Sequence, residues 1–352
     1  MTRHQVSCTP RGSLRLCAGL ALSLSAHILS GAERSDERGP GLFPYPPVMP
    51  EAHAETYKTA GQTNLQLYIF NPKDHTATNR RPAVVFFFGG GWISGSPQQF
   101  EKQCQYFASR GMVAISADYR VASRQGAKPV QCVADAKSAI RWVRKNASRL
   151  GIDPNRVAAG GGSAGGHLAG CIAVVPGLDE PGEDPSISAV PNAVVLFNPA
   201  LVLAPLDGND FGRLAAKVTA ERMGIEPEAL SPAHHVRAGA PPMIMFHGQA
   251  DKVVPYATTE AFAGKMRAAG NRCELFGFEG QPHGFFNYRR GGNPFFVQTL
   301  KQADQFLDYD NVTMLALNQG KVGELVEDIV QQAYFQQLQE QLKVLRRKPG
   351  SK

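Results

Sequence analysis

The chain has 352 residues, of which 43% are hydrophobic and 19% are charged; this excludes a disordered protein and suits one large α/β domain. The formal net charge is +7, and three of these charges are arginines in the first 32 residues, so the rest of the chain carries 7 − 3 = +4. Those remaining bases are scattered, apart from a short run near the C-terminus, which excludes a basic stripe for nucleic acid.

Residues 1–32 have the composition of a secretory signal peptide. Their basic start contains three arginines, residues 14–29 are mostly apolar, and Ser30-Gly31-Ala32 offers small residues for cleavage. The apolar stretch is short and interrupted, so we expect no stable membrane insertion, with an uncleaved anchor as the alternative. The mature protein is therefore expected to be secreted or periplasmic.

Four cysteines remain after such a cleavage. They allow three disulfide pairings, among which the sequence does not choose, and buried free thiols are an equally good alternative. Their wide spacing differs from the close cysteine pairs of zinc sites, so we expect no metal. These residues are Cys104, Cys132, Cys171 and Cys273.

Residues 33–60 are polar and Pro-rich and are expected to form a linker or N-terminal arm. From 61 to 308, apolar runs alternate with patterns of helical spacing, which predicts a catalytic domain of α/β class with a mostly parallel sheet and helices on both faces. The expected strands are 64–70, 82–88, 112–117, 157–160, 193–197, 243–246 and 273–278, and the expected helices are 98–110, 130–150, 164–175, 257–269 and 294–307.

Residues 309–352 follow this pattern as a C-terminal helical extension. The segment 321–347 is Gln-rich and has apolar residues near one face, which predicts an amphipathic helix packed on the body. The alternatives are a dimer contact through this helix and a helix lying on a membrane surface.

The segment Gly161-Gly162-Ser163-Ala164-Gly165 fits the pattern G-x-S-x-G. A serine in this pattern occupies a strained strand-to-helix turn, where side chains two residues to either side would collide, so glycine is favoured. The helix that follows directs free N–H groups toward the reacting carbonyl. A phosphate-binding turn is the alternative, but no lysine follows as in a P-loop. Ser163 is thus the candidate nucleophile.

An earlier strand leads into the loop Gly89-Gly90-Gly91-Trp92. We expect the backbone N–H groups of Gly90 and Gly91 to form an oxyanion hole together with that of Ala164. A plain turn is the alternative, although it does not require three glycines. Trp92 is expected to line the substrate pocket, with simple packing as its alternative role.

Two residues complete the expected chain order of serine, acid and histidine. Asp251 follows the strand at 243–246, at the edge where sites of open α/β sheets assemble. His283 follows the last strand, in a loop with Gly and Pro neighbours. In this arrangement His283 accepts the proton of Ser163, and Asp251 orients the imidazole. We expect no cofactor, because these three groups complete the chemistry unaided.

At these residues the chain resembles α/β-hydrolase esterases of the acetyl-esterase and hormone-sensitive-lipase-like kind, which include bacterial feruloyl and acetyl-xylan esterases. The resemblance covers about residues 63–308 and implies the α/β-hydrolase fold. Such enzymes usually carry His-Gly-Gly-Gly in the oxyanion loop; Phe88 replaces that histidine here, but the donor glycines match, so we expect activity to survive. The motifs are FFFGGGW at 86–92, ADYR at 117–120, GIDPNRVAAGGGSAGGH at 151–167, SPAHHV at 231–236, HGQADKVVP at 247–255 and GQPHGFF at 280–286.

The resemblance implies a serine carboxylic ester hydrolase that acts on short-chain acyl esters. The segments 33–60 and 201–242 are the material for a cap, so we expect a minimal cap and an open cleft that suits acetyl or feruloyl groups on polysaccharides as well as small-molecule esters. One alternative is a prolyl-oligopeptidase-like serine peptidase, for which the chain lacks an accessory domain. The other is a catalytically inactive binding homologue, which an intact triad opposes.

Overall fold

Eight strands form one mixed sheet in the order β1-β2-β4-β3-β5-β6-β7-β8. β1 and β2 pair antiparallel, β2 and β4 pair antiparallel, and every remaining pair is parallel. This confirms the mostly parallel sheet expected from the sequence. The strands are β1 His53–Ala60, β2 Thr63–Phe70, β3 Arg81–Phe87, β4 Val113–Ala117, β5 Ile152–Gly162, β6 Val194–Phe197, β7 Met243–Gly248 and β8 Cys273–Phe278.

The structure is a computed structural model that describes residues 43–208, 218–289 and 292–318, with side chains described as far as residue 308. The expected signal peptide and the amphipathic segment 321–347 lie outside these residues, and the predictions made for them stay predictions. No helix in the described ranges is both long enough and apolar enough to cross a membrane.

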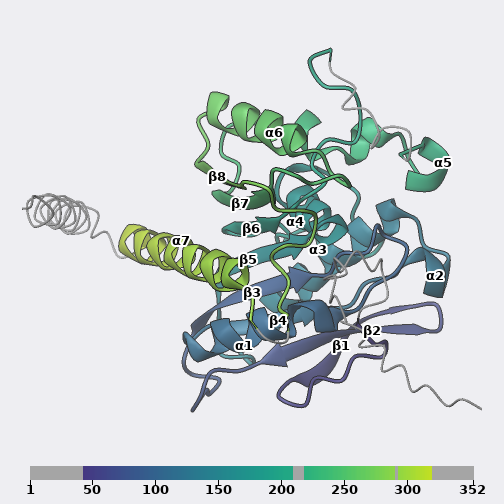
Figure 1. Cartoon of the computed structure of the whole chain (residues 1–352). Helices are drawn as coiled ribbons and strands as arrows, with labels where there is room; N and C mark the ends of the chain where they lie inside the picture. The colour runs from purple at the N-terminus through teal and green to yellow at the C-terminus, as the bar shows by residue number, and fades with distance from the viewer. Residues whose placement is uncertain (1–42, 209–217, 290–291, 319–352) are drawn as a thin grey trace, which may run out of the picture. The chain divides into compact units, whose positions relative to one another are not determined.

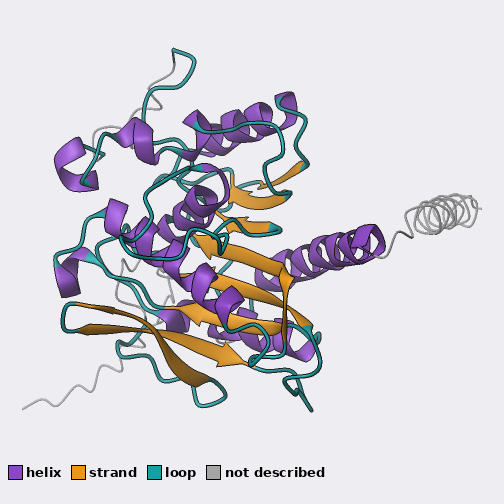
Figure 2. Cartoon of the chain, turned by 180° about the vertical axis from the view of Figure 1, so that it is seen from behind, coloured by secondary structure: helices purple, strands orange, loops and turns teal. Residues whose placement is uncertain are grey.

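Helices cover both faces of the sheet (Figures 1 and 2). α1 and α7 contact each other on one face, and α3 and α4 contact each other on the other. The α-helices are α1 Glu101–Ser109, α2 Ala122–Gln125, α3 Pro129–Lys145, α4 Ala164–Val174, α5 Ala220–Met223, α6 Tyr256–Ala268 and α7 Pro294–Asn318, and the 3-10 helices are η1 Pro97–Phe100, η3 Pro227–Leu230 and η4 Pro232–His234.

The assignment of residues 33–60 to a linker or arm is wrong for residues 53–60, which form β1. This strand lies at the edge of the sheet and pairs only with β2. Only Tyr57 of this strand is buried, and most of the other side chains are polar. The sequence of residues 53–60 therefore shows no clear alternation of apolar and polar residues. An edge strand with so little burial has the composition of a surface segment.

Three elements have a boundary that differs from expectation by five residues or more; one is α3, which ends at Lys145 and not at residue 150. β5 begins at Ile152, five residues before the expected strand, because Ile152 pairs with Arg81 of β3 ahead of an irregular polar stretch. α7 continues to Asn318, so the expected domain boundary at residue 308 falls inside a helix.

The strand arrangement positions the site. β3 and β4 are buried along nearly their whole length, as strands between two helical layers must be. Parallel strands end at the same edge of a sheet. The candidate residues Ser163, Asp251 and His283 follow the carboxyl ends of β5, β7 and β8 respectively, and all three therefore reach that one edge.

Candidate active site

Ser163 occupies the turn between β5 and α4. Its backbone has φ 54° and ψ −118°, a conformation that an L residue rarely adopts. A Cβ atom on Gly161 would lie 2.5 Å from the carbonyl group of Gly165, and one on Gly165 would lie 1.9 Å from the Phe87 carbonyl oxygen. Both glycines are therefore required by close packing, as the sequence pattern predicted.

Ser163, His283 and Asp251 form a continuous hydrogen-bonded chain. His283 Nε2 lies 2.9 Å from Ser163 Oγ, and His283 Nδ1 lies 2.7 Å from Asp251 Oδ2. The carboxylate side chain is fully buried, whereas the imidazole is 22% exposed. The structure thus brings together all three residues that the sequence singled out, in the order serine, imidazole and carboxylate.

Asp251 is held by five hydrogen bonds. Its Oδ1 accepts the backbone N–H groups of Val253 and Val254, at 2.8 and 2.9 Å. Besides His283, two side chains contact its Oδ2: Asn198 Nδ2 at 2.6 Å and His247 Nε2 at 3.1 Å.

This arrangement keeps the Asp251 carboxyl ionised. Burial acts to raise its pKa, but the hydrogen bonds from His247, His283 and Asn198 outweigh burial and hold the pKa well below its usual range. A permanently charged carboxylate fixes Nδ1 of His283 as the protonated nitrogen, because a carboxylate only accepts hydrogen bonds. Nε2 of His283 is then the acceptor for the Ser163 hydroxyl proton.

Sequence reasoning missed His247 and Asn198 as members of this site. His247 is fully buried; its Nδ1 contacts Thr259 Oγ1 at 2.7 Å, so the ring is fixed on both sides. Asn198 directly follows β6 and has φ 43°. Their position in the sequence could have identified them, because a polar residue at the carboxyl end of a parallel strand reaches the same sheet edge as Ser163.

The glycine loop that is expected to form the oxyanion hole, called the oxyanion loop below, follows β3 and approaches Ser163. A Cβ atom on Gly89 would lie 3.3 Å from Ser163 Cβ. Gly90 has φ 130°, and a Cβ there would lie 2.0 Å from the Ser94 carbonyl oxygen, so this turn requires glycine. Within the described residues, neither the Gly90 nor the Gly91 amide donates a hydrogen bond to the protein. Ala164 is the first residue of α4, where amides have no intrahelical partner.

Phe88, which replaces the family's usual histidine, is packed against Tyr119. The two rings stack with centroids 4.1 Å apart, and the Tyr119 hydroxyl donates a hydrogen bond of 2.7 Å to the Phe88 carbonyl oxygen. Both side chains are fully buried. The start of the oxyanion loop is therefore supported by stacking and by one buried hydrogen bond, without an imidazole.

Trp92 is directed toward α4. Its side chain is buried, and its indole N–H donates to His167 Nδ1 at 3.2 Å, while His167 Nε2 donates to the Leu230 carbonyl oxygen at 2.8 Å. Burial lowers the pKa of His167 to about 4, so the ring is neutral at physiological pH. Trp92 thus connects the oxyanion loop to α4 and η3, and its role as a pocket wall stays a prediction.

The described residues offer no group of three or more His, Cys, Asp or Glu side chains placed to hold a metal ion. Their four cysteines are buried free thiols. Burial raises the pKa of each thiol, which keeps them protonated. The site therefore consists of the serine, imidazole and carboxylate chain, its supporting side chains and the glycine loop.

A mostly parallel sheet covered by helices on both faces, with these three groups at its carboxyl edge and the serine on a strand-to-helix turn, defines an α/β-hydrolase. The family model BD-FAE matches residues 67–266. The chain therefore belongs to the BD-FAE family and is an esterase-type α/β-hydrolase.

Solved structures of Thermogutta terrifontis esterase 2 are similar to this chain. The form phosphoramylated by tabun is 55% identical, with a TM-score of 0.71, and the match covers 75% of this chain and 97% of that one. The propionate-bound form is also 55% identical, with a TM-score of 0.70, covering 75% and 96% respectively.

A curated relative is more distant. Esterase LipC of Mycobacterium tuberculosis is 31% identical over 219 residues, which are 59% of this chain and 54% of that protein. The chain spans about half the length of the curated relatives it matches.

Proposed function

We propose that this protein is a serine carboxylic ester hydrolase that acts on short-chain acyl esters through an acyl-enzyme. The observation that carries the proposal is the unbroken chain from Ser163 Oγ through the His283 ring to the ionised Asp251. In the first step the Ser163 oxygen attacks the ester carbonyl carbon as His283 Nε2 takes the hydroxyl proton. His283 then gives that proton to the leaving alcohol.

Water completes the cycle. His283 takes a proton from a water molecule that attacks the acyl group on Ser163, and returns it to the serine oxygen as the acid departs. In both steps the carbonyl oxygen becomes an oxyanion. The free amides of Gly90, Gly91 and Ala164 are the proposed donors to it, and each such donor is typically worth about 3 kcal/mol in the transition state.

The preference for short acyl chains rests on the relatives. Thermogutta terrifontis esterase 2 was solved with propionate bound and with butyrate bound. We extend this to acetyl or feruloyl esters on polysaccharides, because the expected signal peptide would place the enzyme where such polymers occur. Export and the polysaccharide substrate are both part of the proposal.

Hydrolysis of p-nitrophenyl esters from acetate to dodecanoate tests the proposal. We expect the highest kcat/KM on the shortest chains. Ser163→Ala should lower kcat at least about 10³-fold, whereas Ser148→Ala, an exposed serine remote from the site, should leave it unchanged. Activity on aminoacyl p-nitroanilides but not on esters would instead support the peptidase alternative and overturn the proposal.

Acetylated and feruloylated xylan test the narrower substrate. Release of acetate or ferulate by the wild type, and its loss in Ser163→Ala, is the expected result. Hydrolysis of free short-chain esters with no release from either polymer would remove polysaccharides from the proposal and leave the esterase itself intact.

A further inference from the structure

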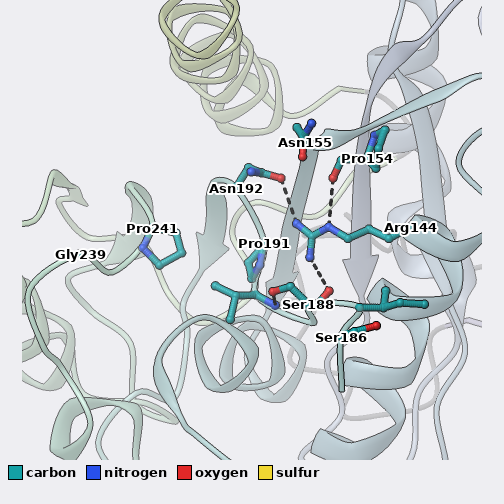
Figure 3. Close-up of a pocket in the computed structure, with 11 residues that line it drawn as sticks. Arg144, Pro154, Asn155, Ser186, Ser188, Pro191, Asn192, Gly239 and Pro241 are labelled. Carbon is teal, nitrogen blue, oxygen red and sulfur yellow. Dashed lines mark hydrogen bonds between the residues drawn. The ribbon is translucent and has the colours of Figure 1, made fainter. Parts of the chain in front are cut away.

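A cavity lies near the start of β5, away from Ser163, which follows the end of that strand. It is an open surface hollow of about 630 Å³, formed by α3, the start of β5 and the segments that precede β6 and β7 (Figure 3). Asn155, near the start of β5, lines it, and Ser163 follows the end of the same strand. Eight residues of extended strand span roughly 26 Å. This cavity is therefore separate from the candidate active site.

The guanidinium of Arg144 lies in this cavity and contacts neutral acceptors. Its Nε donates to the Pro154 carbonyl oxygen at 3.0 Å, its Nη1 to the Ser188 carbonyl oxygen at 2.6 Å, and its Nη2 to Asn192 Oδ1 at 3.0 Å (Figure 3). A guanidinium has five N–H donors, so about two remain for another partner.

No carboxylate of the described residues forms an ion pair with Arg144. The neighbouring Asp153 pairs instead with Arg156 at 3.3 Å and with Arg80 at 3.8 Å. Burial lowers the pKa of Arg144 to about 10, so it stays charged at neutral pH. A partly buried charge with no counter-charge is unfavourable, and a bound anion would relieve that cost.

The other lining residues indicate which anion fits. Arg144 is the only charged residue among those that line the cavity. Val190, Pro191 and Pro241 contribute apolar surface to the cavity. Val190 is 42% exposed. One guanidinium matches a single carboxylate in a bidentate pair, whereas inorganic phosphate, which carries more charge, would lack a second cation. The apolar surface and the volume suit an organic body attached to that carboxylate.

We propose that this cavity is a non-catalytic binding site for a small organic monocarboxylate, which pairs with Arg144 and packs its apolar body against Val190, Pro191 and Pro241. The site would accept the acid product of the proposed ester hydrolysis, but the binding itself does not rest on that proposed function.

The test is a titration of the full chain, labelled with ¹⁵N, with sodium butyrate and sodium benzoate at constant ionic strength. The backbone amides of Asn155 and Asn192 report on the cavity. We expect their resonances to shift and saturate with a Kd in the millimolar range. Inorganic phosphate is the comparison anion and should produce no saturating shift.

Replacement of Arg144 itself would also remove the bonds that hold residues 188 and 192, so the informative variant is Val190→Glu. It places a carboxylate beside Arg144 at an exposed position, and we expect it to weaken butyrate binding at least about tenfold. Val48→Glu makes the same change at a valine that is 68% exposed and remote from the cavity, and it should bind like wild type.

Three results would overturn the proposal. They are the absence of a saturating shift with either carboxylate, an equal response to inorganic phosphate, and unchanged binding by Val190→Glu. Because the readout is binding at Asn155 and Asn192, none of these results depends on whether the chain hydrolyses esters.

Discussion

Gln99 accepts a hydrogen bond from the Gly89 amide at 2.6 Å. The side-chain nitrogen of Gln99, Nε2, donates a hydrogen bond to Asn287 Oδ1 at 3.0 Å. Gly89 belongs to the oxyanion loop, and Asn287 lies four residues after His283. One side chain on η1 therefore connects the loop proposed to bind the oxyanion with the loop that carries the proposed base, His283.

Replacement of Gln99 by leucine should lower kcat about tenfold and change KM little, because it removes the bridge that sets the distance between Gly89 and His283 without touching a substrate contact. Gln98→Leu is the matched control, since among the described residues the side chain of Gln98 bonds only the exposed Val48 amide. Steady-state kinetics on p-nitrophenyl acetate measure the effect. An equal change in both variants would contradict a positioning role.

His247 should control the orientation of Asp251. His247→Leu removes the hydrogen bond to Asp251 Oδ2 and leaves Asp251 with four of its five partners. We expect kcat to fall about tenfold and the free energy of unfolding to fall by about 1–3 kcal/mol. His247→Gln, whose amide can still donate, should recover part of both.

The control for this prediction is His53→Leu, which changes an exposed histidine on β1. It should leave kcat unchanged. A His247→Leu enzyme with full kcat, or a glutamine variant no better than the leucine variant, would show that His247 only fills space.

Because of His167, the free energy of unfolding should decrease as the pH falls. Its folded pKa of about 4 lies below the unfolded value of about 6.5, so between these values the unfolded chain binds more protons and acid favours unfolding. Relative to His167→Gln, which does not titrate, the wild type should lose up to about 1.4 kcal/mol per pH unit as the pH falls from about 6.5 to about 4.

Urea unfolding of both proteins across this pH range measures the difference. The comparison with a variant is needed because burial raises the pKa of Asp118 to about 6, which gives the opposite trend in an overlapping range. A constant difference between the two proteins from pH 7 to pH 4 would contradict the prediction.

Much of the fold and the three central residues could be predicted from sequence, because each leaves a local signal. Several buried parallel strands are continuous apolar runs, and Ser163, Asp251 and His283 each follow a strand that the sequence predicts, in a fixed order. β1 left no such signal, because an edge strand with one buried residue is mostly polar.

The supporting contacts could not be predicted, because they are tertiary. Gln99 and Asn287 are 188 positions apart, and Asn198 and Asp251 are 53 apart. The packing of Phe88 on Tyr119 is a similar case. The sequence showed only that an imidazole was missing, whereas the stacking that replaces it depends on how β3 and β4 lie side by side.

The central claim is that Ser163 is an activated nucleophile, and covalent labelling by a fluorophosphonate tests it most directly. An unactivated serine reacts slowly with this reagent. We expect the intact wild-type mass to increase by one adduct, located by peptide mapping on Ser163. Ser163→Ala should not be labelled, and His283→Ala should be labelled far more slowly. A wild type that is not labelled, or that is labelled at a different residue, would contradict the account.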